Sequence, residues 1–214
     1  MPLPKLEISH EQMMTLLETG YKKAIEGLPG SLNCQQLAEE YLAKYPTKQI
    51  AAQKLIENQI AKCTTSGFIT GLGGAITLPV AVPANVASVL YVQMRMIAGI
   101  AAIGGYDVNS DEVQTLVYVC LAGTSIADIC KSTGIKIGNK VTMNLLKKLP
   151  ATVLTKINHK IGFKLLTKFG EKGVINLVKL VPLAGGVIGG SVDFIGTKTI
   201  SKYAYKMFIE NNLE

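Results

Sequence analysis

The chain has 214 residues, enough for one domain with a sizeable core, and no linker divides it. Hydrophobic residues make up 48% of it and its mean hydropathy is +0.30, so it lies below a typical multi-span membrane protein. The start MPLPKLEISHEQ has no cationic head followed by an apolar core, so we expect no secretory signal and a cytosolic chain.

The net charge of +7 is concentrated in one segment. Residues 131–179 carry eleven lysines against a single acid, Glu171. Of the 22 cationic residues only Arg95 is an arginine. Lysine suits a diffuse anionic surface, whereas arginine suits a fixed, bidentate partner. We therefore expect the two residue types to be used differently.

Helical periodicity dominates the chain and strand alternation is nearly absent. Capping boxes at Ser9 with Gln12 and at Asn33 with Gln36 predict the first two helix starts. Asn109 is expected to cap a later helix. Helical segments are expected over residues 11–28, 34–45, 48–71, 84–104, 110–123, 125–132, 136–149, 151–169, 172–180 and 183–211.

The dominant helical period predicts an all-α fold, a single compact domain of about eight or nine helices spanning residues 1–214. We expect residues 1–50 to form N-terminal helices ahead of a core over residues 51–208.

No catalytic signature is visible. The only histidines, His10 and His159, lie in separate helices and are expected to be surface or hydrogen-bonded side chains. Gly-x-Ser-x-Gly, His-Glu-x-x-His and paired carboxylates are absent. The cysteines share no Cys-x-x-Cys spacing and are expected to be small buried hydrophobes: Cys34, Cys63, Cys120 and Cys130. We expect a non-enzymatic protein without a metal or cofactor.

Glycines recur at helical spacing within two blocks of the sequence. The first is SGFITGLGGAITLPVAVPANVASVLYVQ, and its helix-packing residues are Gly67, Gly71, Gly74, Pro79 and Pro83. The second is PLAGGVIGGSVDF, with Gly185, Gly186, Gly189 and Gly190. No strand or Gly-Lys-Ser/Thr supports a nucleotide loop. Small residues at this spacing let helices approach closely, so we expect the blocks to pack together, as plain core or around lipid.

Residues 63–106 contain one charged group, Arg95, which raises the question of a membrane hairpin. Arg95 would lie near the middle of a span, at a cost of roughly 2.5 to 3.5 kcal/mol, so a buried core is favoured. Its expected partner is Asp193, with a lipid phosphate or carboxylate as the functional alternative.

Lysines recur every fourth residue in two helices, and we expect them to face an anionic membrane surface. A solvated face is the plain alternative. Nucleic acid is not expected, because arginine and aromatic residues are not interleaved. The stripes consist of Lys156, Lys160, Lys164 and Lys168, and of Lys198, Lys202 and Lys206.

The two glycine blocks, with the acidic capped helix between them, resemble the EcsC family of bacterial proteins over about residues 51–208. The family is named after a protein encoded beside an ABC transporter, so the resemblance implies membrane-linked work and names no reaction. A more distant likeness to the senescence domain of spartin-like proteins implies lipid contact or transfer, and it carries over no catalytic residue.

The function expected from these features is peripheral association with anionic membrane lipid, with lipid bound or shielded between the glycine blocks. The alternatives are a helical adaptor for a membrane transporter or another protein, and a conditionally inserting pore-forming protein.

Overall fold

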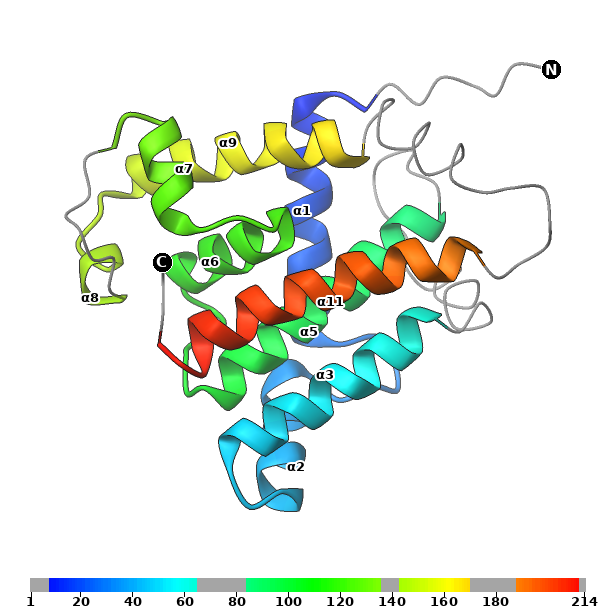
Figure 1. The fold of residues 1–214 in the computed structure, drawn as a ribbon. Helices are drawn as coiled ribbons and strands as arrows, with labels where there is room; N and C mark the ends of the chain where they lie inside the picture. Colours follow the sequence, from blue (N-terminus) through cyan, green and yellow to red (C-terminus); the bar gives the residue numbers. More distant parts are fainter. Residues whose placement is uncertain (1–7, 65–83, 136–142, 170–187, 212–214) are drawn as a thin grey trace, which may run out of the picture.

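Helices are the only regular secondary structure in residues 8–64, 84–135, 143–169 and 188–211, the part of the chain that the computed structural model describes (Figure 1). Nine helices in this part confirm the all-α prediction. Their bounds are α1 His10–Glu26, α2 Cys34–Lys44, α3 Lys48–Thr64, α5 Ala84–Ile103, α6 Asp111–Ala122, α7 Ile126–Ser132, α8 Met143–Leu146, α9 Ala151–Phe169 and α11 Ile188–Phe208. The helix expected over residues 172–180 lies outside the described residues.

Side-chain caps set several of these helix starts. The capping boxes predicted at Ser9 and Asn33 are both present, with side chain and backbone bonded in each direction. The cap predicted at Asn109 is wrong by one residue. Ser110 caps α6, since its side chain accepts the backbone N–H of Val113. The Asn109 N–H instead donates to the Asp107 carboxylate in the preceding turn.

The centre of the fold is α5, which packs against α1, α2, α3, α6 and α11 (Figure 1). Every side chain from Ala87 to Ile103 is buried. A helix covered on all sides needs no polar face, so its sequence can be apolar throughout. Burial inside the protein therefore accounts for the charge-poor sequence of α5.

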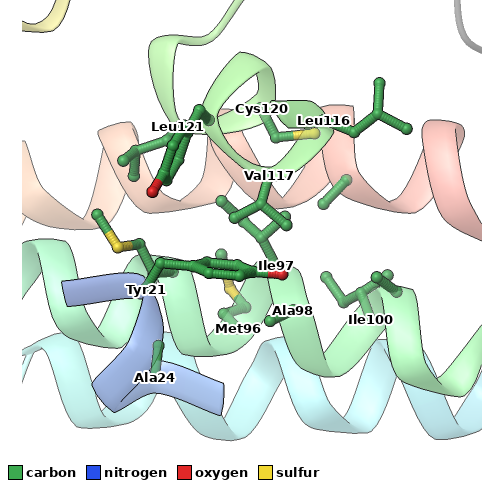
Figure 2. Packing of buried hydrophobic residues seen from close by; sticks show 14 of the residues in the cluster. Tyr21, Ala24, Met96, Ile97, Ala98, Ile100, Leu116, Val117, Cys120 and Leu121 are labelled. Atoms are coloured by element: carbon green, nitrogen blue, oxygen red, sulfur yellow. The ribbon is translucent and has the colours of Figure 1, made fainter. Parts of the chain in front are cut away.

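Apolar side chains from α1, α5 and α6 meet in the core. Figure 2 shows Val117 of α6 directed toward Ile97 of α5, with the ring of Tyr21 from α1 beside Ile97 and Ala24 of α1 farther off, at the lower left. Tyr21 is buried, and its hydroxyl donates to the backbone carbonyl of Val108, 2.6 Å away. A buried hydroxyl requires a hydrogen-bond partner. This hydrogen bond therefore links α1 to the α5–α6 connection.

Glycines allow close contact around α5. A Cβ on Gly99 would lie 2.7 Å from Cδ2 of the buried Leu55 of α3. A Cβ on Gly104 would clash with the backbone carbonyl of Phe208 at the end of α11. The helices therefore approach one another at positions where a larger residue would not fit.

In the described residues, no single helix is both long and apolar enough to cross a membrane. One bent pair, Asp111–Leu121 with Ile126–Ser132, meets the requirement by length and composition only, and its two parts are bent by 92°.

Candidate functional site

The outer face of α9 is cationic. Lys156, Lys160 and Lys164 are exposed, and their spacing of four residues aligns them along one side of the helix. Lys168 continues the series in α9, although its side chain lies outside the described residues. The α9 sequence contains no acid. Its opposite side is buried against α1, α6 and α7 through Leu154, Ile157, Ile161 and Leu165. The predicted amphipathic lysine helix is thereby confirmed.

A large aromatic side chain accompanies these lysines. Phe163 is 54% exposed, more than any other large hydrophobic residue in the described part of the chain. The ring of His10 stacks on it, with the ring centroids 3.9 Å apart. Sequence reasoning missed Phe163, although the buried positions Ile161 and Leu165 on either side of it indicate that it points outward.

The two histidines come together where α1 meets α9. His10 Nε2 lies 3.0 Å from the His159 carbonyl oxygen, and the two ring centroids are 4.8 Å apart. Gly162 makes this approach possible, because a Cβ there would lie 2.6 Å from Met14 Sδ and 2.9 Å from His10 Nε2. His10 is therefore hydrogen-bonded, as expected, but no local signal predicted that the two residues would be neighbours.

An open pocket of about 430 Å³ lies between α7 and α9. Two cations of the α9 stripe and one α7 carboxylate line it, together with hydroxyl and apolar side chains. The complete lining is Lys160, Lys164, Asp128, Thr124, Ser132, Thr167, Ile129 and Phe163. The pocket thus joins the cationic face to the exposed aromatic ring.

The second lysine stripe lies on α11, where Lys198, Lys202 and Lys206 are exposed as predicted. A smaller pocket of about 270 Å³ opens between α3 and α11 and is lined in part by Lys202, Lys206 and Glu210. Both stripes therefore border a hollow in the surface.

Arg95 is buried at 7% exposure and is directed toward α1 and the α1–α2 connection. Its guanidinium donates to the backbone carbonyl of Ala24, at 3.0 Å, and to that of Leu32. The neighbouring Gln93 donates to Thr197 of α11, at 3.0 Å. Two residues along a helix correspond to about 200° of rotation, so Arg95 leaves α5 on the side away from Thr197. These hydrogen bonds show that Arg95, the only arginine in the sequence, links α5 to α1 and to the α1–α2 connection.

The other half of the expected Arg95–Asp193 pair cannot be placed, since the Asp193 side chain lies outside the described residues. The same holds for Gly67, Gly71, Gly74, Pro79, Pro83, Gly185 and Gly186. Gly189 and Gly190 belong to α11, but their surroundings are also outside the described part. Packing of the two glycine blocks therefore stays a prediction.

Cys34, Cys120 and Cys130 are buried free thiols, as predicted, and the side chain of Cys63 is outside the described residues. Burial raises the pKa of the Cys34 thiol to about 12, although nearby Arg95 opposes the rise. In the part of the chain that is described, no three His, Cys, Asp or Glu side chains gather into a group that could hold a metal ion.

A comparison with protein families identifies the family of this chain. The model of the EcsC protein family matches residues 9–209. That range also includes α1 and α2, which lie before residues 51–208, where the sequence resembles this family. No curated protein and no solved structure matches the chain. Because the family match extends over most of its length, the chain belongs to the EcsC protein family.

Proposed function

We propose that this protein is a non-enzymatic, lipid-binding helical protein that docks peripherally on anionic membrane through the outer face of α9. The observation that supports the proposal is the combination on one helix of three aligned, exposed lysines and the exposed ring of Phe163. Cationic side chains beside an exposed aromatic residue suit the headgroup layer of a bilayer.

The expected binding energy is modest. Each lysine near an anionic surface contributes about 1 kcal/mol. Lys156, Lys160 and Lys164 together would then contribute about 3 kcal/mol, or roughly a hundredfold in membrane partitioning. Such binding is reversible and weakens as salt screens the surface charge.

Sedimentation with liposomes tests this proposal. The variant Lys156→Gln/Lys160→Gln/Lys164→Gln should lose roughly a hundredfold in partitioning onto phosphatidylglycerol vesicles at low salt. The matched control removes the same total charge elsewhere, at the exposed Lys22, Lys44 and Lys54.

Wild type and control should both sediment with anionic vesicles and dissociate as salt rises. Equal losses in the two variants would mean that only net charge matters and would contradict docking by α9. Wild type that binds neither anionic nor zwitterionic vesicles would contradict membrane docking altogether.

The proposal includes lipid shielded between the glycine blocks, for which retained lipid in native mass spectrometry of the purified protein is the test. A measured mass equal to that of the protein without lipid would count against lipid shielding.

The second candidate is a helical adaptor for a membrane transporter or another protein. The observation that favours it is a pair of exposed apolar side chains, Leu42 at 42% and Ile50 at 37%, on either side of the α2–α3 turn. If Leu42→Ser/Ile50→Ser disrupts the function in cells while liposome binding is unchanged, the adaptor role is favoured.

A further inference from the structure

The pocket between α7 and α9 is lined by opposite charges that form no close ion pair with one another. Lys160 and Lys164 line it from α9, and Asp128 lines it from α7. Within the described residues, no ion pair of 4.0 Å or less joins Asp128 to either lysine. A ligand that carries a negative and a positive group could therefore engage both walls of the pocket.

We propose that this pocket binds the headgroup of a membrane phospholipid that has both a phosphate and a primary ammonium group, as phosphatidylethanolamine does. The phosphate lies between Lys160 and Lys164, and the ammonium contacts Asp128. This inference rests on the proposed membrane docking and adds to it a preference for one lipid class.

The α9 wall supplies the hydrogen-bond donors. Lys160 and Lys164 are one helical turn apart on the same face, so both ammonium groups can reach one phosphate. A lysine ammonium has three donors and no acceptor, which suits phosphate oxygens. A phosphodiester carries a single negative charge, which these two lysines face, while the single carboxylate of the pocket, on Asp128, is left for the ammonium.

The α7 wall supplies the acceptors. Ser132 follows Asp128 by four residues and therefore lies on the same side of α7. The Ser132 hydroxyl already donates to the carbonyl of Ile129, at 2.8 Å, so its oxygen is left to accept. A carboxylate and a hydroxyl acceptor one turn apart match an ammonium group that donates several hydrogen bonds.

These acceptors distinguish ethanolamine from choline. A trimethylammonium group has no N–H to donate and is usually held by several aromatic rings. Phe163 is the one aromatic residue that lines the described pocket. It is also 54% exposed, so the acyl chains of a bound lipid can pass it toward the bilayer. The volume of about 430 Å³ is in the range of small-molecule sites.

The test uses the full chain and vesicles with a constant fraction of phosphatidylglycerol, in which the remaining lipid is phosphatidylcholine or phosphatidylethanolamine. Wild type should partition at least about fivefold more strongly onto the phosphatidylethanolamine vesicles, since one charge-assisted hydrogen bond contributes this much or more. Asp128→Asn and Ser132→Ala should each reduce that ratio toward one while retaining binding to the phosphatidylcholine mixture. The control Asp111→Asn, at an exposed acid of α6, should keep the wild-type ratio.

The outcomes separate the pocket from the docking face. Wild type that binds both mixtures equally, or an Asp128→Asn variant that keeps the full preference, overturns the pocket assignment and leaves docking by α9 intact. Wild type that binds neither mixture overturns the docking proposal, and the pocket assignment with it. Soluble phosphoethanolamine at micromolar concentration should not displace the protein from vesicles. Displacement would make a soluble phosphate ester the ligand and overturn the assignment to a lipid.

Discussion

Replacing Arg95 with methionine should detach the α1–α2 connection from α5. The guanidinium makes hydrogen bonds to the carbonyls of Ala24 and Leu32, and hydrogen bonds to charged groups contribute about 1.5 to 3 kcal/mol each. Methionine keeps much of the side-chain volume and removes the cost of burying a charge, which offsets part of this loss. We expect a net destabilisation of about 2 to 4 kcal/mol. In a domain of this size, 3 kcal/mol lowers the Tm by about 6 to 12 °C.

Urea unfolding followed by far-ultraviolet circular dichroism measures this change. The control Lys44→Met removes an exposed cation and should stay within about 0.5 kcal/mol of wild type. If Arg95→Met is as stable as wild type, the hydrogen bonds to the two carbonyls do not hold the connection and the structural assignment of Arg95 is refuted. Below its unfolding transition, Arg95→Met should still bind anionic vesicles. Loss of binding by the folded variant would instead support a headgroup contact.

Two further predictions concern packing and thiol chemistry. Gly104→Ala should destabilise the protein by about 1 to 3 kcal/mol, because its Cβ meets the Phe208 carbonyl. Gly196→Ala in α11, whose Cβ would meet no atom within 4 Å in the described part of the chain, should stabilise it by about 0.5 to 1 kcal/mol. Equal changes in Tm for Gly104→Ala and Gly196→Ala would contradict the close approach of Gly104 to the Phe208 carbonyl. With a pKa of about 12, the Cys34 thiol should remain protonated and resist iodoacetamide at pH 8 until urea unfolds the chain. Rapid native alkylation, measured by peptide mass spectrometry, would contradict its burial.

Local signals predicted the helices well. The boxes at Ser9 and Asn33 involve residues three apart, so sequence alone specifies them, and α9 begins and ends as expected. Side-chain burial in α3 was harder to predict. Ile50 is exposed, whereas the smaller Ala51 and Ala52 are fully buried. The helix α3 packs against α2, α5 and α11, and such tertiary packing decides which of its side chains are buried.

In the candidate site, too, local sequence predicts some features, and tertiary contacts decide the others. The lysine face follows from helical spacing and was predicted. The partners of Arg95 were not, because they are backbone carbonyls 63 and 71 residues away, and every residue carries such a group. The pocket depends on how α7 lies against α9, so the placement of Asp128 opposite Lys160 and Lys164 has no signature in the sequence.

A single fluorescent reporter tests docking by α9 most directly. The chain contains no tryptophan, so Phe163→Trp introduces one indole at the proposed membrane face. Leu42→Trp, at an exposed position of α2, is the matched control. With phosphatidylglycerol vesicles, the emission of Phe163→Trp should shift to the blue and be quenched by brominated acyl chains, while Leu42→Trp stays unchanged. Vesicle-bound protein with no shift at position 163, or with equal shifts at both positions, would contradict the account.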